Sequence, residues 1–246
     1  MPAGPVWRGR GRVGEGCDMF RYELHCHTVE TSVCGKWRAE DMVRRYHERG
    51  YTGLCVTDHL HPKFLAKIDH EGDWQRCVDA FLLGYRAAKA AGEALGMDIL
   101  FGIEEGVGDG KEVLLYGITP QFLYDHPEIR DCDLPHLSRI VREAGGFFVQ
   151  AHPFRVRDYI PRPWEALDPD LFDGVEIYNA CNPPLDNLRA VQWAANNGLP
   201  PIAGSDRHYM GHCENFGILV DRRIRTEEEL AQVLMEGDYS LNTPGV

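Results

Sequence analysis

Histidine and carboxylate residues recur along the chain at spacings that suit the binding of divalent metal ions. His25 and His27 stand two residues apart, and so do Asp206 and His208. On an extended strand such a pair points to one face, where both side chains can reach the same cation. Two cations ~3.5–4 Å apart could activate a water molecule and hold the oxygens of a phosphoryl group. The first expectation from the sequence is therefore a hydrolytic metal centre.

Further residues of the same kind follow strand-like segments elsewhere in the chain. Asp58 and His59 follow one such segment, Glu104 ends another, and His152 follows a third. Each motif has an ordinary explanation when taken alone, since an Asp at such a place can simply cap a helix. Together they are informative, because a parallel α/β barrel assembles its active site at the carboxyl ends of its strands. Mixed nitrogen and oxygen ligands suit zinc, manganese or iron.

The elements that must position these residues are short apolar segments alternating with longer amphipathic ones, which is typical of βα units. We expect strands at 20–24, 53–57, 98–103, 112–118, 145–151, 174–179, 199–204 and 216–220, and helices at 37–50, 74–95, 134–146, 185–198 and 226–238. This pattern predicts a parallel sheet closed, or nearly closed, into a single-domain barrel over residues 19–246, with residues 1–18 as a disordered extension. The Pro-rich segment 159–169 is expected to pass over the barrel mouth.

Composition narrows the class of partner. The 246 residues carry a net charge of −12, which disfavours sequence-independent binding to nucleic acid and favours a small substrate. No apolar run approaches the ~20 residues that cross a membrane. The eight cysteines are scattered singly, without a disulfide or zinc-knuckle spacing, so a reducing cytoplasm is the simplest expectation. The oligomeric state stays open.

Five motifs in order resemble the PHP (polymerase and histidinol phosphatase) family. They are H-x-H at 25–27, T-D-H at 57–59, G-x-E at 102–104, A-H-P at 151–153 and S-D-x-H at 205–208. The resemblance spans residues 19–220, and it implies a distorted (β/α)7 TIM-like barrel with two or three divalent ions, Zn, Mn or Fe, used for phosphoester hydrolysis. It implies as ligands His25, His27, His59, Glu104, His152, Asp206 and His208, with Glu104 bridging two ions, and Asp58 orienting a ligand imidazole.

Two departures limit this resemblance. Where family members usually place an Asp or His before a Gly, this chain has Cys34, which is either a metal ligand or an ordinary buried thiol. Many members also carry a His on the strand after the bridging acid, and segment 112–118 has none. The second metal ion would then be loosely held or absent.

Phosphate recognition needs positive charge beside the metals. Arg155 and Arg207 are the candidates, and Arg155 is favoured because strand alternation turns Arg207 away from the face of Asp206 and His208. Either could instead be a surface arginine. Asn179 ends a strand at the same face and is expected to contact substrate.

The leading hypothesis is a phosphatase that hydrolyses a small phosphomonoester by metal-activated water, with Glu104, Asp58, Arg155 and Arg207 as catalytic candidates. The alternatives are a phosphodiesterase or exonuclease and a non-catalytic, metal-binding regulatory barrel. An amidohydrolase-type centre ranks lower, because the chain has Glu104 and no strand-end lysine to bridge the metals.

Overall fold

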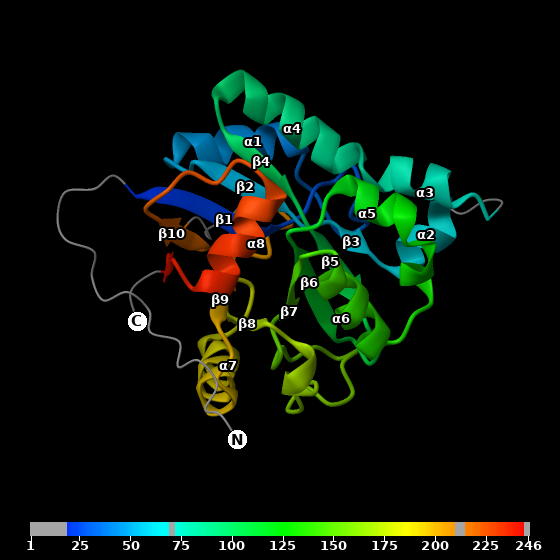
Figure 1. The fold of residues 1–246 in the computed structure, drawn as a ribbon, viewed down its shortest axis with the longest axis vertical. Helices are drawn as coiled ribbons and strands as arrows, with labels where there is room; N and C mark the ends of the chain where they lie inside the picture. The colour runs from blue at the N-terminus through cyan, green and yellow to red at the C-terminus, as the bar shows by residue number, and fades with distance from the viewer. Residues whose placement is uncertain (1–18, 69–71, 210–214, 244–246) are drawn as a thin grey trace.

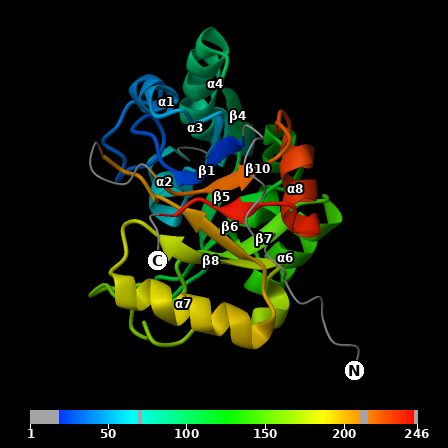
Figure 2. The ribbon, with the colours of Figure 1, turned by 90° about the vertical axis from the view of Figure 1, so that its left-hand side faces the viewer.

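The strands of the protein form two sheets with helices packed on their outer faces (Figures 1 and 2). This computed structural model describes residues 19–68, 72–209 and 215–243, so the expected extension at 1–18 lies outside the described residues. The strands are β1 (Phe20–Cys26), β2 (Gly53–Val56), β3 (His59–Leu60), β4 (Asp98–Phe101), β5 (Ile103–Gly106), β6 (Glu112–Tyr116), β7 (Phe147–Gln150), β8 (Gly174–Asn179), β9 (Pro201–Gly204), β10 (Ile218–Val220) and β11 (Ser240–Leu241).

Five strands make one sheet, in the order β11-β10-β1-β2-β4, and six make the other, in the order β3-β5-β6-β7-β8-β9. The chain itself joins them, because β3 follows β2 after two residues and β5 follows β4 after one. On the opposite side, Cys26 of β1 forms an isolated parallel bridge with Arg207, just beyond β9. The fold is thus a mixed α/β single domain in two sheets. Among the described residues, the hydrogen-bonded strands do not form one closed ring, so the expected distorted barrel is not confirmed.

The expectation of a parallel sheet was wrong in part. Strand β6 is antiparallel to both β5 and β7, and β10 is antiparallel to β1. The β5–β6 pair is a hairpin whose connection covers only residues 107–111. A parallel crossover needs a dozen or more residues, so a connection this short permits only antiparallel pairing.

The helices cover the sheets from outside. Helices α1 (Ala39–Glu48) and α4 (Leu83–Leu95) pack on each other and on β2 and β4, while most contacts of the other described helices lie on the second sheet or between helices. The other described helices are α2 (Pro62–Ile68), α3 (Trp74–Phe81), α5 (Pro120–Asp125), α6 (Leu134–Glu143), α7 (Pro184–Asn197) and α8 (Glu227–Glu236). There are 3₁₀ turns at Pro127–Arg130 and Pro169–Leu171. The helix expected over 74–95 is two helices, α3 and α4, which meet at Leu82.

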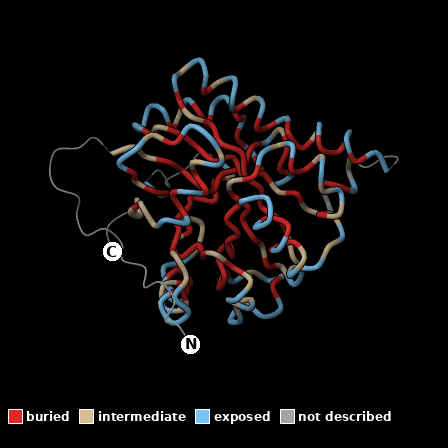
Figure 3. The backbone as a smooth tube through the Cα atoms, in the orientation of Figure 1, coloured by how far each residue is buried: buried red, intermediate tan, exposed pale blue. Residues whose placement is uncertain are grey.

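The core lies on both faces of the strands (Figure 3). One apolar cluster fills the space between the strands and helices α1, α3 and α4, and another joins the inner residues of β1, β6 and β7 to helix α8. Helices α7 and α8 end at Gly198 and Gly237, whose φ angles of +67° and +69° suit glycine. This packing holds the strand ends in fixed positions.

The long connection between β7 and β8 lies against the β5–β6 hairpin. Arg162 pairs with Asp109 at 2.7 Å, and Lys111 Nζ donates to the carbonyl of Pro153 at 2.8 Å. The expected excursion of segment 159–169 therefore runs beside this hairpin. Among the described residues, no helix combines the length and apolar character that crossing a bilayer requires.

Candidate metal centre

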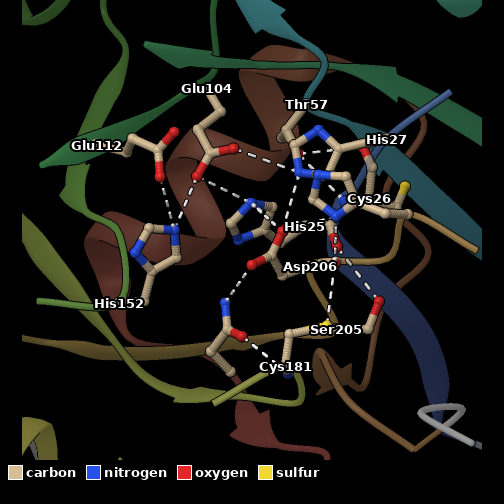
Figure 4. A network of polar contacts seen from close by, with 12 residues as sticks. His25, Cys26, His27, Thr57, Glu104, Glu112, His152, Cys181, Ser205 and Asp206 are labelled. Atoms are coloured by element: carbon tan, nitrogen blue, oxygen red, sulfur yellow. Dashed lines mark hydrogen bonds and ion pairs between the residues drawn. The ribbon is translucent and has the colours of Figure 1, made fainter. Parts of the chain in front are cut away.

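The predicted ligands converge, although they come from five separate strands or strand ends (Figure 4). His25 lies on β1, His59 opens β3, and Glu104 lies on β5. His152 and Asp206 follow the ends of β7 and β9. Single atoms of His25, His27, Glu104 and Asp206 lie within 4.8 Å of one another, and so do those of His27, His59 and His208.

Glu104 stands at the middle of the cluster, and its two oxygens face different imidazoles. Oε1 lies 3.2 Å from His25 Nε2 and 3.0 Å from His152 Nε2. Oε2 lies 2.9 Å from His59 Nδ1 and 3.3 Å from His27 Nε2. Glu104 is fully buried. A carboxylate whose oxygens each approach a separate pair of imidazoles has the arrangement of a bridging ligand.

Asp206 and His152 adopt unusual backbone conformations. Their φ angles are +53° and +24°, a region that residues with side chains rarely occupy. Such strain persists only where surrounding contacts impose it, and it is frequent at functional sites. Here Asp206 N donates to the carbonyl of His25 at 2.8 Å, and His152 N donates to Glu176 Oε2 at 3.1 Å. The two residues are thereby turned toward the cluster, with Asp206 Oδ1 3.2 Å from His27 Nε2.

The buried charges perturb one another strongly. Burial opposes the ionisation of Glu104, yet His25 and His59 hold its pKa well below the ordinary value. Burial also opposes a charge on His25, but Glu176 and Glu104 raise its pKa. Burial lowers the pKa of His27, and the neighbouring imidazoles of His59 and His208 lower it further. The centre thus holds an ionised carboxylate among imidazoles whose pKa values are shifted in opposite directions, and a bound metal would take each ligand imidazole in its neutral form.

Two acids inside strands support the cluster from behind, and the sequence analysis did not identify them. Glu176 Oε1 accepts a hydrogen bond from His25 Nδ1 at 2.8 Å, which leaves Nε2 facing Glu104. Glu23 Oε1 accepts from the backbone N–H groups of His25 and Ser205, both at 2.9 Å, and so ties β1 to the end of β9. Both acids are buried. An acid within an otherwise apolar strand was the available signal, because a buried carboxylate requires partners.

Asp58 acts differently from the expectation. Its carboxylate accepts from Thr28 N at 2.7 Å, Thr28 Oγ1 at 2.7 Å and Ser32 Oγ at 2.6 Å. Ser32 Oγ lies 3.5 Å from His27 Nδ1, so Asp58 reaches an imidazole only through this serine. Burial raises the pKa of Asp58 to about 6. Asp58 therefore fixes the turn after β1 rather than orienting a ligand ring directly.

The two candidate arginines occupy different surroundings. The guanidinium of Arg155 contacts Asp206 and donates to Asn182 Oδ1 at 3.1 Å and Asn179 Oδ1 at 3.4 Å, so it lies at the cluster. The guanidinium of Arg207 stacks 4.9 Å from the ring centre of Trp37. The structure therefore does not bring the guanidinium of Arg207 to the cluster: this buried side chain packs on Trp37, and its Nε donates to the carbonyl of Tyr209 at 2.9 Å.

Asn179 and Cys34 both lie beside the predicted ligands. Asn179 Nδ2 donates to Asp206 Oδ2 at 3.2 Å and to Glu176 Oε2 at 2.9 Å. Cys34 is exposed, so the alternative of an ordinary buried thiol was wrong. Protein atoms around the thiol shield it partly from water, which opposes its ionisation, but hydrogen bonds with His208 and His59 lower its pKa to about 6.

The donor set fits a divalent cation. Among the described residues, His25 Nε2 and Glu104 Oε2 are buried atoms that make no well-directed hydrogen bond, although Glu104 Oε1 lies 3.2 Å from the first and His59 Nδ1 lies 2.9 Å from the second. Leaving such atoms unpaired costs roughly 1–3 kcal/mol each. A cation among them would satisfy both and would reduce the repulsion between carboxylates.

The comparisons with known proteins agree with this chemistry. The sequence profile of the PHP domain matches residues 23–152, just over half of the chain. The chain belongs to the PHP domain family. A second profile, of the PHP-associated region, matches residues 184–239. The PHP resemblance seen in the five motifs is thereby confirmed. Among curated proteins, no sequence match is found.

Solved structures of similar fold include PHP-like proteins. A two-domain protein from Bacteroides vulgatus, which contains a predicted PHP-like metal-dependent phosphoesterase, matches with a TM-score of 0.63 and 16% identity over 92% of this chain and 65% of that one. This PHP chain thus spans less than two thirds of that protein. An amidohydrolase from Chromobacterium violaceum, with bound sulfate and no metal, matches with a TM-score of 0.55 and 18% identity over 91% and 98% of the two chains. PsfC from Pseudomonas syringae matches with a TM-score of 0.54 and 15% identity over 88% of each chain.

Proposed function

We propose that the protein is a metal-dependent phosphoesterase that hydrolyses a small phosphomonoester. The observation that carries this proposal is the placement of Glu104, whose two oxygens approach separate pairs of imidazoles in a buried centre. Membership of the PHP family supports it. So does the net charge of −12, which favours a small substrate over a nucleic-acid backbone.

Two or three divalent cations, Zn, Mn or Fe, are the cofactors that we propose. The imidazoles and carboxylates of the five strand ends would hold them, with His27, His59 and His208 on one side of Glu104 and His25 and His152 on the other. Cys34 would add a thiolate beside His59 and His208. Cations bound there would polarise the phosphoryl oxygens and activate a water molecule.

The chain's own contribution is to orient and stabilise charge. Arg155 is held by Asn179 and Asn182 with its guanidinium directed at Asp206, beside the proposed cations. A guanidinium matches two phosphate oxygens at once, so Arg155 would orient the ester and stabilise the charge that develops on it. Asn179, which contacts both Arg155 and Asp206, would fix this geometry and line the substrate site.

The fold that we propose around this centre is the distorted seven-stranded TIM-like barrel implied by the family. The short breaks between β2 and β3 and between β4 and β5, together with the Cys26–Arg207 bridge, support this proposal. The breaks would then be distortions of a single ring of strands. They occur where the chain presents His59 and Glu104.

Two other activities stay open as outcomes of the test. A phosphodiesterase or exonuclease would use the same metals on a substrate with a second ester bond. An amidohydrolase is the activity given for the neighbour from Chromobacterium violaceum, whose bound sulfate is also a tetrahedral oxyanion like phosphate. A non-catalytic metal-binding protein would retain cations and turn over none of these substrates.

The deciding experiment is a substrate screen on metal-reconstituted protein. We expect release of inorganic phosphate from small phosphomonoesters, with little release of mononucleotides from an oligonucleotide and no hydrolysis of amides. His25→Ala and Glu104→Ala should abolish turnover while the circular dichroism spectrum stays native, because both side chains serve the centre. Wild-type rates in either variant at saturating metal would refute the assignment, as would a protein that binds metal and hydrolyses no phosphomonoester.

A further inference from the structure

Glu112 places a carboxylate in the centre that neither the motifs nor the resemblance identified. It begins β6 and pairs with Gly106 of β5, while its carbonyl accepts from Ala151 N at 3.1 Å on the β7 side. This pairing puts Glu112 next to His152 in space. Its side chain is 15% exposed, so it reaches solvent at the edge of the cluster, and Figure 4 shows it beside His152.

The two oxygens of Glu112 face the same two imidazoles that Glu104 faces from the other side. Oε1 lies 3.7 Å from His59 Nδ1, and Oε2 lies 3.5 Å from His152 Nε2. Charge-assisted hydrogen bonds are usually about 2.7–2.9 Å long, so these approaches are too long for strong direct pairing. They are close to the roughly 3–3.5 Å that separates two ligand atoms each about 2.1 Å from one ion.

A role as the counterion of Arg155 explains these contacts less well. Arg155 Nη1 lies 3.9 Å from Glu112 Oε2, whereas the same guanidinium is in direct contact with Asp206. Atoms of His59, Glu104 and Glu112 lie within 4.8 Å of one another, and among the described residues the buried Glu104 Oε2 makes no well-directed hydrogen bond, although His59 Nδ1 lies 2.9 Å away. That atom faces the space shared by the three residues.

We propose that Glu112 is a further metal ligand, which with His59 and Glu104 holds a divalent cation at the edge of the centre that reaches solvent. This inference rests on the proposed function for its role in turnover, but not for metal binding itself. The next residue of β6 on the same face is Leu114, which is apolar and buried and pairs with Glu104. Glu112 is therefore the ligand that β6 contributes. The position beside Glu112 has two carboxylates and is therefore richer in oxygen ligands than the side of Glu104 that faces His27 and His208. This composition favours Mn²⁺ over Zn²⁺ at the position beside Glu112.

The test measures metal content and affinity rather than rate. Wild type, Glu112→Gln and Glu112→His are loaded with Mn²⁺, passed through gel filtration and analysed for bound metal, and each affinity is measured by competition with a chromogenic chelator. We expect Glu112→Gln to lose one equivalent, or to bind it at least about tenfold more weakly, because the amide carries no charge. Glu112→His should restore the equivalent, since imidazole is also a ligand.

Asp109→Asn is the matched control. Asp109 lies in the same hairpin, is exposed, and has a φ of +50° that asparagine accommodates, so this variant should bind metal like wild type. Unchanged content and affinity in Glu112→Gln would overturn the inference, and so would equal losses in Glu112→Gln and Glu112→His, which would indicate a counterion. If Glu112→Gln loses one equivalent of metal but the wild-type protein hydrolyses no ester, the proposed function alone is refuted. Ester hydrolysis with unaltered binding in Glu112→Gln would refute only the ligand role.

Discussion

Replacing Glu176 by glutamine should weaken metal binding although Glu176 contacts His25 on the side of the ring away from Glu104. Its Oε1 accepts from His25 Nδ1 at 2.8 Å, and its Oε2 accepts from His152 N at 3.1 Å and Asn179 Nδ2 at 2.9 Å. All three partners are donors. A glutamine has one acceptor oxygen and one NH₂ group, so it cannot satisfy both sides.

Either orientation of the amide has a cost. If its oxygen accepts from His25, the NH₂ group faces the donors of His152 and Asn179, and a buried mismatch of this kind costs about 1–3 kcal/mol. If the amide is flipped, its NH₂ group faces His25 Nδ1 and favours the tautomer that carries hydrogen on Nε2, the atom 3.2 Å from Glu104. That tautomer cannot bind metal through Nε2. Partners of ligand imidazoles are typically worth 10–100-fold in affinity, which is about 1.4–2.7 kcal/mol.

Chelator competition measures this effect directly. We expect Glu176→Gln to bind Zn²⁺ or Mn²⁺ about 10–100-fold more weakly, and urea unfolding of the metal-free protein to show a loss of about 1–3 kcal/mol. Glu143→Gln is the control, because Glu143 is 63% exposed on α6 and pairs only at the surface with Arg139. Metal affinity within twofold of wild type in Glu176→Gln would refute the positioning role, and a loss confined to stability would show that Glu176 serves the fold alone.

Two further predictions concern the metals and the turn that Asp58 fixes. Complete removal of the metals by chelator should lower Tm by about 8–16 °C, since ligand at 1,000 times its Kd adds about 4 kcal/mol and each kcal/mol shifts a chain of this size by about 2–4 °C; equal melting curves with and without chelator would contradict the metal assignment. Gly84→Ala should destabilise the protein by about 1–3 kcal/mol in urea unfolding, because the added Cβ would contact Thr28 Oγ1 and lie 2.6 Å from Asp58 Oδ2. Ala90→Gly, at an exposed position of the same helix, measures how much the exchange of Ala and Gly changes the stability of this helix without a packing effect. A Gly84→Ala protein more stable than wild type would refute the packing argument.

The sequence predicted most of the elements because local pattern decides them. Each of the eight expected strand segments overlaps an observed strand, from Phe20–Cys26 to Ile218–Val220. Whether neighbouring strands pair in parallel or antiparallel was harder to predict from the sequence. The antiparallel β5–β6 pair follows from a connection of only five residues, 107–111, but the expectation of uninterrupted βα units concealed it. The split of 74–95 at Leu82 was hidden too, because both halves are amphipathic helices and no proline separates them.

The residues of the candidate site were also predictable only in part. Residues in motifs, such as His25 and His152, could be predicted because their type and position at strand ends carry the chemistry. Glu112 could not, because it opens a strand and its neighbours in space, His59 and His152, lie 53 residues before it and 40 after it in the sequence. Only the pairing of β6 between β5 and β7 brings them together.

Glu176 was missed for a local reason. Strand β8 has a register irregularity between Glu176 and Tyr178, so simple alternation does not describe which of its side chains share a face. Glu176 and Asn179 are three residues apart and would point to opposite faces of a regular strand. The irregularity lets both reach the centre, where Asn179 Nδ2 donates to Glu176 Oε2.

The carboxylates around the centre explain why its geometry and its metals should depend on each other. Glu23 and Glu176 each accept backbone N–H groups of the residues that carry or adjoin predicted ligands, and this fixes β1, β7 and β9 relative to one another. Glu104, Glu112 and Asp206 then concentrate negative charge inside that frame, with Arg155 as the nearby guanidinium. A buried excess of carboxylate is unfavourable without compensating cations. Metal binding should therefore stabilise the strand ends that form the site, and loss of metal should loosen those ends before it affects the helices outside them.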